Sequence, residues 1–227
     1  MRANFDNKLS ELNKKLLSMA AMTEQIIAMS IKSLEEQDTK LARETVEFDT
    51  KINEAEREVE RICLNLLLQY QPVFAEDLRR VSAALKMITD MERIGDQAAD
   101  IAEIVPHLKG HTPAECVGIK NMSEEVIKMV TSSIDAYVKK DIELAQRVIK
   151  NDDIVDDYFL KIKSSLVDVI SEKKQDGEYA IDLLMIAKYF ERIGDHATNI
   201  AEWVEFSITG VHKGENCFTT SIPDINN

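Results

Sequence analysis

The sequence has few of the residues that interrupt regular helices. Its 227 residues include only 7 glycines and 4 prolines, and aromatic residues make up 6% of the chain. Gly and Pro disfavour helix interiors by about 1 and 3 kcal/mol relative to Ala. Long uninterrupted stretches rich in Ala, Leu, Ile, Glu and Lys therefore indicate long helices, and no segment shows the strict alternation typical of a β-strand. We predict an all-α protein.

Cysteine is also scarce. Cys63, Cys116 and Cys217 are far apart and form no Cys-x-x-Cys pair, which argues against a cysteine-based zinc site. An odd number of isolated cysteines suits a reducing compartment. The N-terminal residues lack the apolar core of a signal peptide, and no apolar run approaches the length that spans a bilayer. We expect a soluble cytoplasmic protein.

Basic residues are outnumbered by acidic ones. The chain has 28 Lys and Arg against 41 Asp and Glu, which gives a formal net charge of −13. An acidic surface repels the phosphate backbone of DNA and RNA, so the composition argues against nucleic-acid binding. The same field repels free phosphate unless a bound cation intervenes.

The pentapeptide Glu-Arg-Ile-Gly-Asp occurs twice, at Glu92–Asp96 and at Glu191–Asp195. Each copy lies in a longer matched stretch, and further matched blocks precede it in both halves, with small insertions and deletions between the blocks. The chain is therefore interpreted as one unit built twice, comprising residues 1–109 and residues 110–227. The second unit is expected to end in a short loose tail from Val211 to Asn227.

Each unit contains three segments with helical periodicity. They run approximately over residues 6–36, 38–70 and 74–105 in the first unit and 113–140, 141–173 and 177–209 in the second. Asp38 is predicted to cap the second helix, and Thr112 and Pro113 to begin the fourth. Because long helices joined by short connections pack antiparallel, we predict two tandem, pseudo-symmetric three-helix bundles with six long antiparallel helices.

Both pentapeptides belong to rows of acidic and amide side chains. Glu92 and Asp96 are four residues apart and therefore lie on one face of a helix. Carboxylate and amide oxygens are hard ligands that suit Mg²⁺, Mn²⁺, Ca²⁺ or iron. The rows comprise Glu92, Asp96, Asp100 and Glu103 on the third helix, Asp49, Asn53, Glu56 and Glu60 on the second helix, and Glu191, Asp195, Asn199, Glu202, Asp152 and Asp156 in the second unit.

A solvated polar face is the simpler interpretation of any one such row, because long surface helices carry many acidic residues. Like charges four residues apart cost a few tenths of a kcal/mol, and the exact repetition of the pentapeptide with this cost favours a compensating cation. Gly95 and Gly194 add to this, since Gly within a helix costs about 1 kcal/mol against Ala. Two such glycines indicate the close approach of another backbone or a bound species. Tight helix packing alone is the alternative.

No sequence motif indicates catalysis. The chain has no Gly-rich phosphate loop, no Gly-x-Ser-x-Gly and no arrangement of Cys and His typical of a nucleophile. The Glu-x-x-His spacing of di-iron bundles is also missing. We therefore predict that the protein is not an enzyme.

Taken together, the two helical repeats and their Glu-Arg-Ile-Gly-Asp motifs resemble the PhoU family of bacterial regulators of high-affinity phosphate uptake. The resemblance runs from about Phe5 to Val211. It implies a cytoplasmic, often dimeric protein that binds iron, zinc, magnesium or manganese. It further implies that the protein restrains phosphate uptake and the phosphate-starvation response by contacting the ATPase of the phosphate ABC transporter and the phosphate-sensing histidine kinase. The implied metal ligands are Asp49, Asn53, Glu92, Asp96, Asp100, Asp152, Asp156, Glu191, Asp195 and Asn199.

The two halves carry unequal rows. In the first unit the acidic run on the second helix is long, whereas in the second unit it is interrupted by Phe159 and Lys163 after Asp152 and Asp156. The two metal sites are therefore predicted to be related but unequal, with the first richer in oxygen ligands. The alternative to a metal-binding regulator is a metal-independent helical scaffold that docks its partners through a hydrophobic face.

Overall fold

The computed structural model describes residues 2–69, 74–108, 118–172, 177–212 and 215–216. Within these ranges the chain forms six α-helices, one 3₁₀ turn and a minimal β-hairpin. The elements are α1 (Arg2–Glu36), α2 (Thr39–Gln69), α3 (Ala75–Ile104), η1 (Val105–His107), α4 (Ile119–Lys139), α5 (Ile142–Glu172), α6 (Gly177–Thr209), β1 (Val211–His212) and β2 (Glu215–Asn216). The all-α prediction is confirmed.

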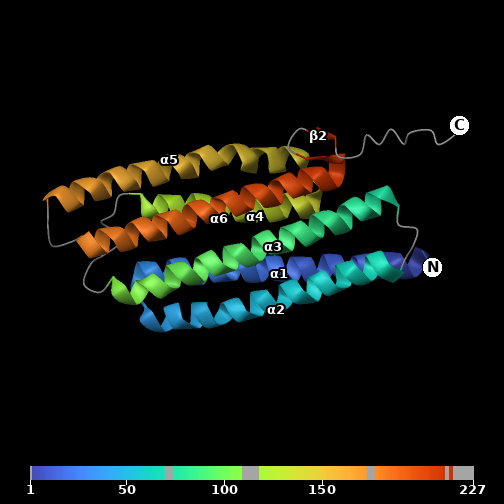
Figure 1. The fold of residues 1–227 in the computed structure, drawn as a ribbon, viewed down its shortest axis with the longest axis horizontal. Helices are drawn as coiled ribbons and strands as arrows, with labels where there is room; N and C mark the ends of the chain where they lie inside the picture. The colour runs from blue at the N-terminus through green and yellow to red at the C-terminus, as the bar shows by residue number, and fades with distance from the viewer. Residues whose placement is uncertain (1, 70–73, 109–117, 173–176, 213–214, 217–227) are drawn as a thin grey trace, which may run out of the picture.

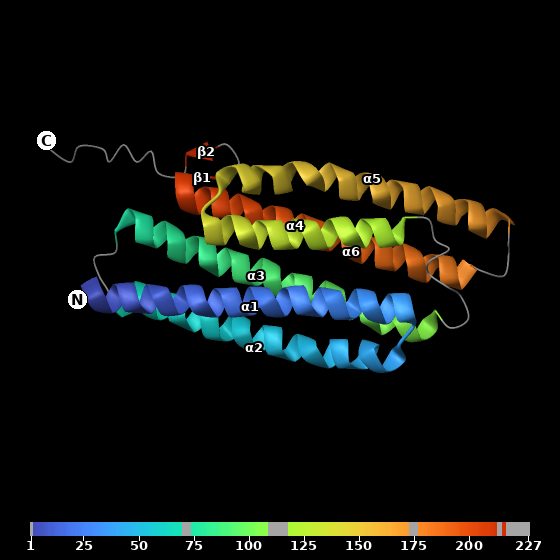
Figure 2. The same ribbon diagram turned by 180° about the vertical axis from the view of Figure 1, so that it is seen from behind.

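The six helices form two three-helix bundles that pack side by side. Helices α1, α2 and α3 contact one another, as do α4, α5 and α6. The bundles meet mainly through α3 and α6, which run antiparallel through the centre of the molecule (Figure 1). On the opposite face α1 lies beside α4 (Figure 2). The predicted architecture of two tandem, pseudo-symmetric bundles is thus confirmed, while the boundary at residue 109 lies outside the described residues and stays a prediction.

The turns that follow α1 and α4 are built in the same way. Gln37 and Lys140 adopt left-handed backbone angles, with φ of 51° and 52°. The amides of the next residues, Asp38 and Asp141, donate to carbonyls five residues earlier at 3.0 Å. The carboxylate of Asp38 accepts amides two and three residues on at 2.9 and 3.1 Å, and that of Asp141 accepts the amide three residues on at 2.9 Å. The predicted cap at Asp38 is confirmed, and each repeat has one.

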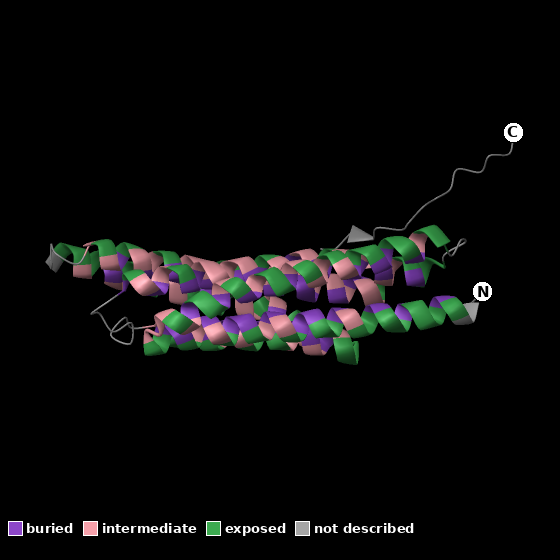
Figure 3. Cartoon of the chain, turned by 90° about the horizontal axis from the view of Figure 1, so that it is seen from below, coloured by how far each residue is buried: buried purple, intermediate pink, exposed green. Residues whose placement is uncertain are grey.

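The hydrophobic core runs along the inner faces of all six helices. In Figure 3 the buried residues face inward and the exposed residues cover the outer faces. Apolar residues recur every three or four positions along α1, and five of them are buried: Leu9, Leu12, Leu16, Met19 and Ile26. Helices α3 and α6 are the most enclosed, because they pack within their own bundle and against each other. The Ile and Gly of both pentapeptides are buried there.

Some predicted boundaries differ from the structure. Helix α3 ends at Ile104, and Pro106 lies within a 3₁₀ turn rather than directly after the helix. Helix α4 begins at Ile119, and the predicted cap at Thr112 and Pro113 lies outside the described residues. Residues 211–212 pair antiparallel with residues 215–216, so these four residues of the expected tail form paired strands, and the remainder of the predicted tail lies outside the described residues. Strands of two residues are too short to show periodicity. None of the described helices is both long and apolar enough to cross a membrane.

Candidate functional site

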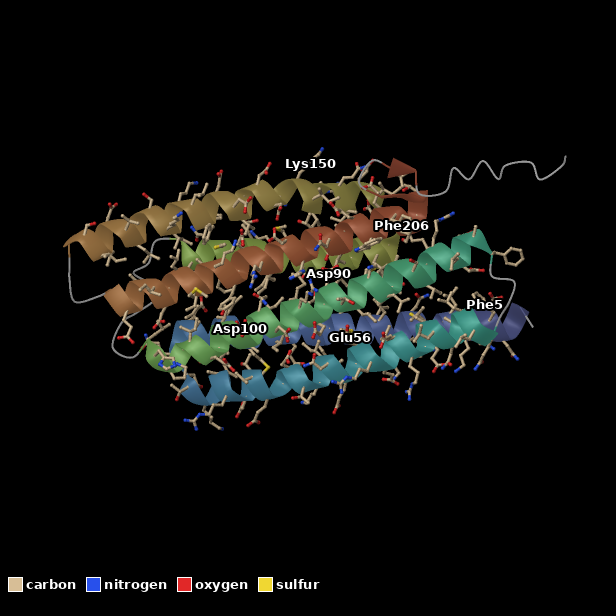
Figure 4. The ribbon with its side chains drawn as sticks, in the orientation of Figure 1. Phe5, Glu56, Asp90, Asp100, Lys150 and Phe206 are labelled. Atoms are coloured by element: carbon tan, nitrogen blue, oxygen red, sulfur yellow. The ribbon has the colours of Figure 1, made fainter. Side chains whose placement is uncertain are left out.

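In the first repeat, the acidic row of α2 faces the acidic row of α3. The α2 row contributes Asp49 and Glu56, and the α3 row contributes Glu92, Asp96 and Asp100. Glu56 and Asp100 are visible on the same face of the molecule in Figure 4, on adjacent helices. We call these five carboxyl groups, together with Asn53, the first acidic cluster.

Gly95 allows the two rows to approach. A Cβ atom built on Gly95 would lie 2.9 Å from Oδ1 of Asp49 and 3.0 Å from Cδ1 of Ile52. The carboxylate of Asp49 therefore rests against the α3 backbone at the centre of the pentapeptide. The contact is tight packing of two α2 side chains against α3, which is the alternative explanation for this glycine, and a bound species near Gly95 stays a prediction.

Asp49 has an oxygen without a partner. Asn53 donates to Oδ2 of Asp49 at 2.8 Å, whereas Oδ1 is buried and accepts no hydrogen bond. A buried carboxylate oxygen without a donor is costly. A cation at this position would satisfy it, since carboxylates are ligands for hard cations.

Burial raises the pKa of every carboxyl group in the first acidic cluster, and neighbouring carboxylates raise it further in all of them except Asp96, where Arg93 opposes the rise. Burial is the main cause in each case. The pKa of Glu92 is raised further by the charges of Asp96, Glu56 and Asp49. The pKa of Asp49 is raised further by Asp96 and Asp100, while the bond from Asn53 opposes this. Raised pKa values show that the ionised groups lack sufficient positive charge nearby, which a bound cation would supply.

The corresponding row in the second repeat is centred on Asp152. Burial raises its pKa to about 6, and the charges of Asp195 and Asp156 contribute. The contact at Gly194 is looser than at Gly95, because a Cβ atom there would lie 3.3 Å from Cγ1 of Val155 and 3.7 Å from Oδ1 of Asp152. Asp156 and Asp195 are exposed. The second row is therefore more open.

Two members of the second row have partners of their own. Oε1 of Glu191 accepts a bond from Lys188 at 2.6 Å. Asn199 donates to Asp90 of α3 at 3.1 Å, and His196 Nδ1 lies 2.9 Å from the same Asp90 oxygen. Asp90 is 8% exposed. These contacts direct Glu191 toward Lys188 and Asn199 toward α3, while Asp195 and Thr198 of α6 lie near Asp152.

Between α3 and α6 the two pentapeptides line one open hollow of about 670 Å³. Its walls include Arg93 and Asp96 from the first repeat, Arg192 and Asp195 from the second, and Asp152 from α5. Neither the hollow shared by both motifs nor the contact of Asp90 with His196 between the repeats was predicted from the sequence. The counterpart of Asp90 is Tyr189 and that of His196 is Gln97, so the duplication gave no signal for either residue.

The metal ligands implied by the resemblance are present as facing rows, but they are not assembled around one point. Among the described residues, no three His, Cys, Asp or Glu side chains are placed to hold an ion together. The first acidic cluster nevertheless fits a hard cation by its donor chemistry, by its raised pKa values and by the unpartnered Oδ1 of Asp49. Its carboxylates would have to turn toward a shared ion. The ten implied ligands stay a prediction.

The described cysteine is unsuited to catalysis. Cys63 is buried, and burial raises the pKa of its thiol to about 12, with the charge of Glu60 contributing. A thiol of this pKa is protonated and inert at neutral pH.

Two tandem three-helix repeats, with acidic rows flanking a shared central seam, define a class of helical repeat proteins. The sequence matches the PhoU domain over residues 16–105 and again over residues 119–204, once in each repeat. The chain belongs to the PhoU family.

Similar proteins support this assignment over nearly the whole chain. A phosphate-specific transport system accessory protein PhoU homolog from Clostridium acetobutylicum is 37% identical over 210 residues, covering 92% of this chain and 96% of the relative. The crystal structure of PhoU from Pseudomonas aeruginosa has a TM-score of 0.87 at 32% identity and covers 91% of this chain and 100% of that one. The PhoU structure from Streptococcus pneumoniae, with a TM-score of 0.82 at 23% identity, covers 91% and 98% respectively and supports the fold.

Proposed function

We propose that this protein is a non-enzymatic negative regulator of phosphate uptake and of the phosphate-starvation response. The observation that carries the proposal is the match of both repeats to the PhoU domain, together with relatives described as phosphate-specific transport system accessory proteins. The proposed partners are the ATPase of the phosphate ABC transporter and the phosphate-sensing histidine kinase. The protein would act in the cytoplasm as a homodimer, associated peripherally with these membrane complexes.

The proposed mechanism uses cations on the acidic rows. The first acidic cluster gathers five carboxyl groups with raised pKa values along α2 and α3. Iron, zinc, magnesium or manganese held there would neutralise this face and reverse the local repulsion of anions. The metal-loaded face would then contact a partner or respond to phosphate. Without cations, the same face repels acidic surfaces.

A capture experiment tests both parts. The purified protein is immobilised and exposed to the transporter ATPase of its own organism at high and low phosphate, with Mn²⁺ or with EDTA. We expect capture with Mn²⁺ and a loss of about tenfold or more with EDTA or with Glu92→Gln/Asp96→Asn, which corresponds to about 1.4 kcal/mol. The matched control is Lys8→Gln/Glu11→Gln, which removes an exposed ion pair on α1. Absence of capture under all conditions would contradict the proposed partner.

A metal-independent scaffold is the second candidate. It is favoured by the lack of a preassembled ligand set among the described residues and by exposed apolar side chains on the second repeat. Leu160, Val167 and Ile181 are 59%, 55% and 58% exposed, and such side chains suit a helical docking face. Under this function, capture of the ATPase is unchanged by EDTA and by Glu92→Gln/Asp96→Asn.

A further inference from the structure

A second hollow lies at the end of the molecule that holds the N-terminus, away from the acidic rows. It has a volume of about 420 Å³ and is enclosed by α1, α3, the end of α4 and the end of α6. Phe206, labelled in Figure 4, marks this end of α6. Because α1 and α3 belong to the first repeat and α4 and α6 to the second, the hollow lies on the seam between the repeats. Its volume falls within the roughly 300–1,000 Å³ of small-molecule sites.

The charge of this hollow is opposite to that of the protein. Arg79, Arg80 and Lys140 line it, against a single acidic residue, Glu76. The whole chain carries a formal charge of −13, so a local excess of positive charge is unusual here. We call this site the basic hollow.

The cations of the basic hollow are not neutralised. Within the described part of the chain, Arg79, Arg80 and Lys140 take part in no ion pair. Nε of Arg79 is buried and has no hydrogen-bond acceptor. A buried guanidinium nitrogen without an acceptor is costly. This nitrogen lies beside the turn at Gly210, so an anion in the hollow would contact the parts of Arg79 that line it. Arginine favours phosphate and carboxylate because its planar fork can donate two parallel bonds.

The surrounding structure fixes these groups in place. Gly210 ends α6 with φ of 79°, and a Cβ atom on Gly210 would lie 3.5 Å from Cδ of Arg79. The stem of Arg79 is therefore held against the turn after α6. Tyr137 of α4 donates to Oδ1 of Asn13 on α1 at 2.7 Å, which ties the two repeats together at the wall of the hollow. Burial raises the pKa of Tyr137 to about 12, and Arg80 opposes this rise. Tyr137 is thus a neutral donor at physiological pH.

The rest of the lining is partly apolar. Leu17, Val138 and Ile208 line the same hollow, and Ser207 adds a hydroxyl group. Inorganic phosphate would contact the arginines but leave these apolar side chains in water. A ligand with both a phosphate group and an organic body would cover both parts.

We propose that the basic hollow binds a small phosphorylated organic molecule. The guanidinium groups of Arg79 and Arg80 hold its phosphate, with the ammonium group of Lys140 contributing positive charge. Its organic body lies on Leu17 and Ile208. Such a ligand would contact both repeats at once. Its binding would make this protein responsive to the supply of phosphorylated organic molecules. The proposal does not depend on metal binding or on the proposed partners.

Calorimetric titration of the full chain in buffer with EDTA tests the proposal. The probes are three phosphate monoesters (AMP, ribose 5-phosphate and phenyl phosphate), with adenosine and inorganic phosphate for comparison. We expect at least one monoester to bind with Kd below about 1 mM. It should bind about tenfold more tightly than either adenosine or inorganic phosphate, a difference of about 1.4 kcal/mol. The lack of binding by all three monoesters overturns the proposal, as does equal binding of adenosine or of inorganic phosphate.

Charge-matched variants locate the site. Arg80→Gln should weaken the binding of the monoester by about tenfold, since charged hydrogen bonds are worth about 1.5–3 kcal/mol. Lys140→Gln should weaken it less, because an ammonium group makes no bidentate contact. Lys150→Gln is the control, since this exposed residue lies on the outer face of α5, away from the hollow (Figure 4). An effect of Lys150→Gln equal to that of Arg80→Gln would overturn the assignment. Thermal unfolding of each variant verifies that it is folded.

Discussion

The two repeats have the same backbone plan but use their acidic residues differently. In the first repeat, Asp49 lies against Gly95 with one buried oxygen unpartnered, and all five carboxyl groups of the cluster have raised pKa values. In the second, Glu191 is paired with Lys188 and Asn199 is bonded to Asp90. The two rows therefore differ in their contacts as well as in their composition, while the predicted inequality of two metal sites stays a prediction.

Some structural features occur in both repeats, whereas others are found in only one. The left-handed turns, the Asp caps and the buried Ile and Gly of the pentapeptide occur in both halves, because each is required by the helix geometry or packing of its own bundle. The partners of the acidic groups differ, because each depends on the residue at a single position. Position 89 is Thr in the first repeat, whereas the equivalent position 188 is Lys in the second.

The largest expected effect on stability comes from breaking the bond network of Asp90. Asp90→Ala should lower the free energy of unfolding by about 2 kcal/mol, because it leaves a half-buried His196 and Asn199 without their acceptor. Urea denaturation of the metal-free protein measures this. Asp153→Ala, at an exposed position on α5, is the control. A loss below about 0.5 kcal/mol, within the range of ordinary surface substitutions, would show that this link between the repeats is not structural.

The second prediction concerns Asp152 and pH. Its folded-state pKa is raised from 3.8 to about 6, so its contribution to stability is present at pH 3.8 and below and is lost as the pH rises through 6. The change that Asp152→Asn causes in the free energy of unfolding of the metal-free protein should therefore be about 1–2 kcal/mol more stabilising at pH 7 than at pH 4. This value is reduced because the side chain is partly exposed.

Chemical denaturation of the wild type and Asp152→Asn at pH 4 and pH 7 measures this difference. Asp153→Asn is the control, since it removes an adjacent exposed carboxylate. If Asp152→Asn changes stability equally at both pH values, the charge of Asp152 is not destabilising.

The third prediction concerns a substitution at position 188 that makes the second repeat resemble the first. Lys188→Thr removes the ammonium group that pairs with Glu191 and that lowers the pKa of Asp195. The affinity of the second repeat for Mn²⁺ should rise about three- to tenfold, since a partly exposed pair contributes up to about 1 kcal/mol. The titration is made in the Glu92→Gln/Asp96→Asn background. An affinity unchanged by the substitution would exclude Lys188 as the reason for the inequality.

The smallest expected effects on stability come from the two glycines. Gly95→Ala gains about 1 kcal/mol of helix propensity and displaces the tips of Asp49 and Ile52, which are 2.9 and 3.0 Å from the new Cβ. Gly194→Ala displaces Val155 by less. Both variants should unfold within about 1 kcal/mol of the wild type. Of the two variants, only Gly95→Ala should weaken Mn²⁺ binding, because it moves the carboxylate of Asp49. Equal metal affinity of the two variants would contradict the role given to Gly95.

Much of the fold could be predicted from the sequence because its causes are local. The period of Leu12, Leu16 and Met19 and the cap at Asp38 depend on one helix or one turn. The acidic rows were predicted from their spacing, but the contact of Asp49 with Gly95 was not, because it depends on how α2 packs against α3. The contact of Asp90 with His196 could not, because it joins two helices 106 residues apart and has no repeated counterpart. The basic hollow was missed for the same reason, since its cations come from separate ends of α3 and α4.

We propose that the two acidic rows are unequal cation sites. Manganese titration of the apo protein, followed by elemental analysis, compares Glu92→Gln/Asp96→Asn with Glu191→Gln/Asp195→Asn, which carry the same change in equivalent positions. The account predicts a loss of affinity of about tenfold or more for the first variant and a clearly smaller loss for the second. Unchanged stoichiometry and affinity in both variants, or a larger loss in the second, would contradict it.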